Sequence, residues 1–167
     1  LAGKGVCIIG EAPGEQEEKV GRPFVGPSGS ELDMALRMAG IKRREAHITN
    51  VLLCRPPGNK LKDFLRRISK VNKERAKDDK PPIPTPMECC APRLEEEMAG
   101  FRHFITLGKT EMTAVTGQTA SIMAVRGGMA ELEATERTPP RKVMPTVHPA
   151  FVLRMPRWKH VFRNDIF

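Results

Sequence analysis

Four short runs of mostly apolar residues recur along this chain, separated by longer stretches in which polar and apolar residues mix. Each run is rich in Val, Ile, Thr or Leu and is followed by glycine, proline or polar residues, which is the pattern of buried β-strands. We therefore predict strands at 5–10, 46–53, 104–108 and 142–147.

Apolar residues at near-helical spacing fill the segments between these strands. A first helix is predicted between a cap at Ser28 or Ser30 and a stop at Gly40. Residues 60–80 predict a basic amphipathic helix, which a proline-rich connector follows. Two further helices are expected at about 90–98 and at 109–115.

Strands and helices alternate through most of the chain, which favours a parallel sheet with helices on both faces. The predicted fold is an α/β three-layer αβα sandwich around a central, mainly parallel four-stranded sheet, in one domain of residues 1–167. The carboxyl ends of parallel strands meet at one edge, where such sheets bind ligands. Glu11, Asn50 and His148 stand at three of these ends. A carboxylate, an amide and an imidazole are therefore predicted to converge in one site.

The charge of the chain indicates a polyanionic partner. Its 167 residues carry a net charge of +8, and residues 60–80 alone hold nine Lys or Arg against four Asp or Glu. Basic side chains bind a nucleic-acid backbone by releasing its condensed counterions, so DNA is the expected partner class. No apolar run approaches the ~20 residues of a membrane span, so no membrane association is expected.

The cysteines indicate a reducing environment. Cys7, Cys54, Cys89 and Cys90 do not form a secreted disulfide pattern, because adjacent cysteines rarely pair with each other. We expect a cytoplasmic protein and a buried, inert thiol at Cys7, which lies within the first strand. The chain opens almost directly on a strand and stops at Phe167 without a turn or cap. We therefore expect a domain excised from a longer chain.

Five sequence blocks, in order, resemble those of family 4 uracil-DNA glycosylases. This family is the branch of the uracil-DNA glycosylase superfamily that carries an iron–sulfur cluster. Each block alone is a weak signal, whereas the ordered set is strong. The blocks are GEAPG at 10–14, GRPFVG at 21–26, TNV and CRPP within 49–57 with Asn59, TPMECCAP at 85–92 and TVHPA at 146–150.

The resemblance implies an enzyme that flips a deaminated base out of DNA and hydrolyses its N-glycosidic bond. Phe24 is implied to stack on the flipped pyrimidine, with Gly10 and Ala12 against the same substrate. Asn50 is implied to bind the N3–H and O4 edge of uracil, because an amide offers one donor and one acceptor. His148 is implied to donate a hydrogen bond to the base O2, where negative charge develops.

Glu11 is implied to act near the sugar, either by orienting the attacking water or by stabilising an oxocarbenium-like transition state. Ordinary structural interpretations exist beside these roles. Phe24 also fits a core aromatic residue, Asn50 a turn at a strand end, and Glu11 a loop carboxylate that accepts from backbone amides. The residues alone leave both interpretations open.

The segment after the histidine motif is implied to contact DNA. Phe151, Val152 and Leu153 offer an apolar wedge for an unstacked base step, although the start of an ordinary amphipathic helix fits them too. The candidate backbone contacts are Ser28, Arg154, Arg157 and Lys159.

The resemblance also implies a [4Fe–4S] cluster held by four cysteines. Cys54 and Cys90 match the later two ligands, with Cys89 as a neighbour one position away. The earlier Cys-x-x-Cys pair would precede Leu1, so two of the four ligands are visible.

Two further departures separate this chain from the family pattern. Ala150 stands where the family has serine, and a basic insertion occupies about 60–84. Such an insertion resembles the glycosylase-like domains fused to phage and bacterial DNA polymerases, which predicts a domain fused or tethered to a polymerase in a bacterial or phage-infected cell. A DNA-repair domain of this size is expected to be a monomer. The alternative function is then a non-catalytic DNA-binding or tethering module. Hypoxanthine or xanthine remains an alternative to uracil as the excised base.

Overall fold

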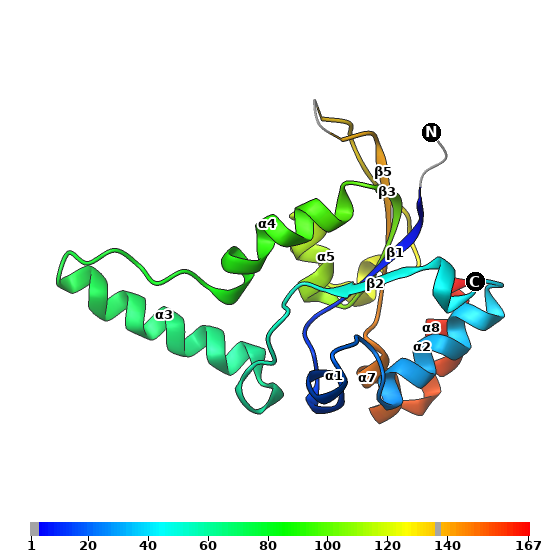
Figure 1. Cartoon of the computed structure of the whole chain (residues 1–167), viewed down its shortest axis with the longest axis horizontal. Helices are drawn as coiled ribbons and strands as arrows, with labels where there is room; N and C mark the ends of the chain where they lie inside the picture. The colour runs from blue at the N-terminus through cyan, green and yellow to red at the C-terminus, as the bar shows by residue number, and fades with distance from the viewer. Residues whose placement is uncertain (1–3, 136–137) are drawn as a thin grey trace.

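The computed structural model describes residues 4–135 and 138–167 and is built around one five-stranded sheet (Figure 1). The strand order is β2-β1-β3-β5-β4; β4 is antiparallel to β5, and the other neighbours are parallel. The predicted α/β class and mainly parallel sheet are confirmed, with one strand more than expected. The strands are β1 (Lys4–Gly10), β2 (His47–Asn50), β3 (Phe101–Leu107), β4 (Ala130–Leu132) and β5 (Arg141–Thr146).

The four predicted helices are all present, whereas the helices at 15–20, 122–125 and 159–166 were not predicted. Residues 15–20 form a short helix with Gly21 in the left-handed conformation at its end. The helix expected from Cys90 begins at Pro86, because Thr85 and Glu88 form a reciprocal capping box. The helices are α1 (Glu15–Val20), α2 (Pro27–Met38), α3 (Leu61–Lys77), α4 (Pro86–Met98), α5 (Lys109–Thr116), α6 (Ile122–Val125), α7 (Pro149–Arg154) and α8 (Lys159–Ile166).

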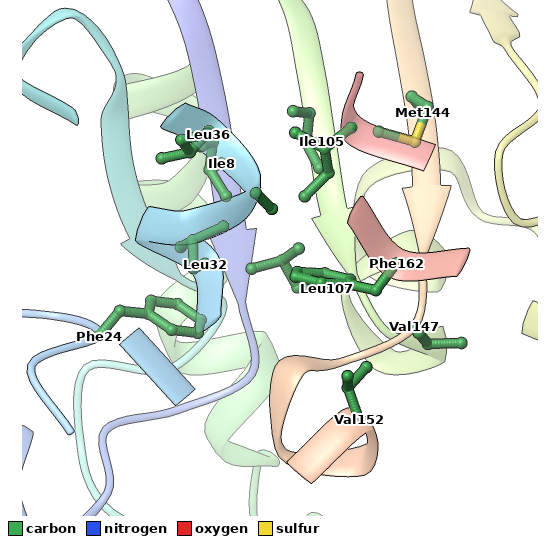
Figure 2. Packing of buried hydrophobic residues seen from close by; sticks show 12 residues of the cluster. Ile8, Phe24, Leu32, Leu36, Ile105, Leu107, Met144, Val147, Val152 and Phe162 are labelled. Carbon is green, nitrogen blue, oxygen red and sulfur yellow. The ribbon is translucent and has the colours of Figure 1, made fainter. Parts of the chain in front are cut away.

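Alternating side chains of the strands build one core on each face of the sheet. Figure 2 shows the first core, in which Ile8 and Leu107 meet Leu32 of α2 and Phe162 of α8. On the other face, strand residues including Ile9 pack with residues of α4. Helices therefore cover both faces, and the predicted three-layer sandwich is confirmed (Figure 1).

Cys7 belongs to the second core and is fully buried, as predicted. Burial, together with the smaller effect of the negative charge of Glu97, raises the pKa of its thiol to about 12. This thiol is therefore protonated at neutral pH and unsuited to bind a metal.

Helix α3 projects away from the sandwich as an arm, which Figure 1 shows on the left. Leu61 at its start is buried, whereas its later residues are half-buried or exposed. The predicted basic helix is therefore present and lies outside the three layers. None of the described helices combines the length and apolar character that crossing a membrane requires.

A buried carboxylate connects α8 to the strand that leads to the site. The side chain of Asp165 is 4% exposed and accepts hydrogen bonds from Thr146 Oγ1 at 2.6 Å and from Arg126 Nε at 2.9 Å, with a second bond from the Arg126 guanidinium. Thr146 ends β5, two residues before His148. Asp165 therefore holds the carboxyl end of β5 against α8.

We expect Asp165→Ala to lower the free energy of unfolding by about 3 kcal/mol, because it leaves a charged donor without its buried partner. Urea unfolding would measure the change. Asp63→Ala is the matched control, since it removes an exposed ion pair with Arg66 and should cost less than about 1 kcal/mol. Equal losses in the two variants would contradict this role of Asp165.

Candidate active site

The structure brings the predicted site residues together at the carboxyl edge of the sheet. Gly10 at the end of β1 pairs with Asn50 at the end of β2. The Phe24 and His148 rings have centroids 5.9 Å apart and a tilt of 33°. A Cβ added to Gly10 would lie 2.6 Å from the Phe24 ring and closer still to Asn50 Oδ1. Phe24 and Asn50 therefore flank Gly10, where any side chain would collide with them, and His148 lies next to the Phe24 ring.

Phe24 has a backbone conformation that non-glycine residues rarely adopt. Its φ is +53°, which costs of order 1–3 kcal/mol and persists when the surroundings enforce it. Arg43 Nη2 donates to the carbonyl oxygens of Pro23 at 2.8 Å and of Phe24 at 3.1 Å. Gly29 packs so closely that a Cβ there would collide with the Phe24 carbonyl.

The residues after Phe24 are held from the other side. Glu17 Oε1 accepts the backbone N–H groups of Val25 at 2.9 Å and Gly26 at 3.0 Å. Together with Arg43, this carboxylate fixes the loop that turns the Phe24 ring toward His148. The ring is 7% exposed and touches the first core. The core interpretation of Phe24 is therefore supported, and its stacking on a flipped base stays a prediction.

Asn50 is held by its backbone and keeps its side chain available. Arg93 Nη2 donates to the Asn50 and Val51 carbonyl oxygens, both at 2.8 Å. Within the described parts of the chain, the Asn50 carboxamide has no hydrogen-bond partner, although the residue is 5% exposed. The turn interpretation required a local side-chain bond and is not supported. A buried amide with unused donors and an acceptor suits an incoming polar edge.

Glu11 lies on the same rim, half-buried, and accepts a hydrogen bond from Thr110 Oγ1 at 3.1 Å. In the described segments no backbone amide donates to its carboxylate, so the loop-carboxylate interpretation is not supported.

A second carboxyl group, Glu111, is buried near Glu11. Burial raises the pKa of Glu111 well above its usual value; a bond from its own backbone N–H lowers it, and the negative charge of Glu11 raises it. Burial therefore favours the protonated form of Glu111.

His148 is the N-cap of α7, and this position determines its tautomer. Nδ1 accepts the Ala150 backbone N–H at 3.1 Å, so the proton of the neutral ring sits on Nε2. Burial, together with the smaller effect of the positive charge of Arg154, lowers the pKa of His148 to about 4, against an opposing effect of the negative charge of Glu17. The ring is thus a neutral Nε2–H donor near neutral pH. Because the bond uses the Ala150 backbone, the missing serine hydroxyl does not affect it.

The candidate DNA contacts differ in availability. Arg154 and Arg157 are exposed, and Ser28 lies half-buried in the first turn of α2. Lys159 is engaged instead, since its Nζ lies 3.9 Å from the buried carboxylate of Glu31, which Arg163 also binds.

The apolar wedge predicted at 151–153 is reduced to a single residue. Val152 belongs to the core, so its place in the wedge was wrong. Phe151 packs on Trp158 with ring centroids 5.9 Å apart, which leaves Leu153, 37% exposed, as the residue free to enter DNA. Ala12 is half-buried and packs against the second core.

The cysteines do not form a cluster site. Cys54 and Cys89 are exposed, Cys90 is half-buried, and Cys7 is in the core. Across residues 4–135 and 138–167, no group of three or more His, Cys, Asp or Glu is placed to hold a metal ion. A four-thiolate cluster therefore does not fit the described residues.

Sequence reasoning missed the residues that support the site, namely Glu17, Arg43, Arg93 and Glu111. Arg93 and Glu97 are four residues apart on a predicted helix, which signals a surface pair. The contact of Arg93 with Asn50 crosses 43 residues and leaves no local pattern. For Glu111 the sequence did contain a signal, because this residue lies on the apolar face of α5, where a carboxyl group would be buried.

Comparison with known proteins gives consistent matches over the whole chain. Residues 2–166 match the family model of the uracil DNA glycosylase superfamily. The type-4 uracil-DNA glycosylase of Thermotoga maritima is 34% identical over 152 residues, covering 89% of this chain and 66% of that protein. The type-4 uracil-DNA glycosylase of Pyrobaculum aerophilum is 32% identical over 173 residues, covering 97% of this chain and 74% of that protein. That of Archaeoglobus fulgidus is 29% identical over 166 residues, covering 96% of this chain and 72% of that protein. The chain thus spans slightly less than two thirds of the Thermotoga protein and about three quarters of the Pyrobaculum protein.

The lowered pKa of His148 predicts a distinct titration. We expect its ring to stay neutral as the pH falls through 6.5 and to protonate near pH 4, followed by NMR of the imidazole nitrogens. Because the folded pKa lies below the unfolded one, the stability from this group is complete above about pH 6.5 and is lost progressively toward pH 4. Titration of His148 near 6.5, or protonation of Nδ1 in the neutral ring, would contradict the geometry.

Proposed function

The chain belongs to the uracil DNA glycosylase superfamily, and we propose that it hydrolyses the N-glycosidic bond of uracil flipped out of DNA. The observation that carries this proposal is the grouping of three side chains at the carboxyl edge of the sheet, with Phe24 and Asn50 beside Gly10 and His148 next to the Phe24 ring. The imidazole is neutral, and among the described residues its Nε2–H has no partner, so it can donate. Stacking surface, amide edge and preorganised donor are the three recognition elements that excision of a flipped pyrimidine requires.

The proposed reaction proceeds by separation of charge in this pocket. The C1′–N1 bond breaks with its electron pair moving into the base, and the developing negative charge at O2 receives the hydrogen bond from His148 Nε2. Asn50 meets the N3–H and O4 edge, and cytosine presents the reversed pattern there. No proton needs to leave His148, which agrees with a pKa of about 4.

Glu11 is proposed to serve the sugar side of the reaction. Its carboxylate, oriented by Thr110, can orient the attacking water or stabilise the positive charge that develops on the sugar. The raised pKa of the nearby Glu111 favours its neutral form, which limits the negative charge beside Glu11. Water then supplies the hydroxyl of the abasic sugar, and its proton leaves with the carboxylate or bulk solvent as acceptor.

The DNA around the flipped nucleotide is proposed to meet Ser28, Arg154 and Arg157, with Leu153 as the wedge. Lys159 is secondary because Glu31 holds it. A single domain over 1–167, a monomeric state, fusion to a polymerase and a cytoplasmic location stay predictions from the sequence.

Excision should depend on the two polar groups of the pocket. We expect His148→Ala and Asn50→Asp each to slow uracil release by roughly 10²–10³-fold, the usual effect of losing one preorganised donor. The measurement is alkaline cleavage of a labelled single-stranded oligonucleotide that contains one deoxyuridine.

His160→Ala, which changes an exposed histidine of α8, is the matched control and should keep the wild-type rate. Wild-type rates in both site variants would overturn the assignment. Tight DNA binding by the wild-type chain without any cleavage would instead favour the non-catalytic module.

The iron–sulfur cluster requires four thiolates, of which Cys54 and Cys90 would supply two. Because the described residues do not provide such a site, we expect residues 1–167 to purify with far less than about four iron atoms per chain. Iron and acid-labile sulfide analysis would measure this, with Cys54→Ser as the comparison. A full complement of iron that Cys54→Ser abolishes would contradict the expectation.

A further inference from the structure

The arm formed by α3 has a basic face that the proposed chemistry does not use. Helix positions advance by about 100° per residue, so Lys62, Arg66, Lys70, Lys73 and Lys77 fall within about 80° of one another. They form one stripe about 22 Å long at 1.5 Å per residue. We refer to these five side chains as the basic stripe.

The opposite side of α3 is occupied by its own connector. Asn72 accepts the backbone N–H of Ile83 at 2.7 Å and donates to the carbonyl of the same residue at 2.9 Å. Arg75 Nε donates to the carbonyl of Pro81 at 2.7 Å. These bonds place the returning chain beside the half-buried apolar residues of the helix, so the basic stripe is left facing solvent.

Three cations of the stripe have no acidic partner. Arg66 pairs with Asp63 and Lys77 with Glu74, each at 3.0–3.1 Å, within one turn of the helix. Lys62, Lys70 and Lys73 are exposed and, among the described residues, form no ion pair. Their charge is therefore uncompensated by the protein itself.

The base of the arm is fixed close to the candidate site. The arm begins eleven residues after Asn50, and Leu61 and Leu65 pack against the second core. Arg55 in the intervening loop donates to Asn59 Oδ1 at 2.6 Å and to Glu18 of α1 at 3.1 Å. The stripe therefore starts at the carboxyl edge of the sheet and runs outward from it, as Figure 1 shows for α3.

We propose that the basic stripe binds the phosphates of DNA that flanks the flipped nucleotide, on the β2 side of the site. The position of the DNA along the stripe rests on the proposed function, because it assumes a nucleotide flipped into the pocket. The attraction itself is between positively charged side chains and negatively charged phosphates. The unpaired lysines recur at intervals of about one to two helical turns. Such a row fits the evenly spaced phosphates of a nucleic acid better than a protein surface, where acidic side chains are not evenly spaced. The stripe reads no sequence and adds affinity along the strand.

The test measures binding of undamaged DNA, so its outcome does not depend on excision. The triple variant Lys62→Gln, Lys70→Gln and Lys73→Gln keeps residues of similar helix propensity, and circular dichroism checks that α3 remains folded. Fluorescence anisotropy with a single strand of about 30 nucleotides, longer than a typical binding site, gives Kd across a salt series. We expect the slope of log Kd against log salt to fall by about 2, or about 0.7 per lost contact.

The matched control is Arg44→Gln, Arg102→Gln and Lys142→Gln, which removes the same charge from exposed residues at the amino-terminal edge of the sheet. It should keep the wild-type slope. An unchanged slope in the arm variant, or an equal fall in the control, would overturn the proposal and leave the arm as a surface for a protein partner. If the arm variant lowers the salt slope and the wild type releases no uracil, binding of DNA by the basic stripe is supported and the proposed reaction is refuted.

Discussion

The parallel pairing of β1 with β2 is the constraint on which the site depends, because it sets Gly10 opposite Asn50. A shift of one residue would exchange the two faces of the strand and break both cores. With this register, the missing side chain at Gly10 makes room for the Asn50 amide and the Phe24 ring. Arg93 holds the end of β2 through two carbonyl oxygens, so the position of the amide follows from backbone geometry.

The electrostatics of the site complement this geometry. The His148 ring is kept neutral by burial and by Arg154, and burial raises the pKa of the Glu111 carboxyl group near Glu11. Negative charge that forms on a leaving base would be stabilised by a hydrogen bond from the oriented Nε2–H of His148, without transfer of the proton. Asp165 connects this arrangement to the fold, since it anchors the strand that leads to His148.

Much of the fold was readable from local pattern, whereas most supporting contacts were not. Apolar runs revealed four strands, but β4 has three residues, too few for alternation to be recognised. The capping box of Thr85 and Glu88 was present in the sequence and would have placed the start of α4 correctly. The pairs Arg163–Glu31 and Arg93–Asn50 join residues 132 and 43 positions apart, and such contacts leave no periodic trace. The burial of Val152 and the engagement of Lys159 also depended on tertiary packing.

The arm leaves and rejoins the sandwich at one place, since Leu61, Leu65 and Met87 all pack on the second core. Loop closure costs only about 0.6 kcal/mol for each doubling of loop length, so the segment between them can lengthen or shorten with little effect on the three layers. Selection on this segment is therefore uncoupled from selection on the pocket. Under the proposed function, a change in the arm would alter how long the protein stays on DNA and would leave the choice of excised base to the pocket, so the two properties could evolve separately.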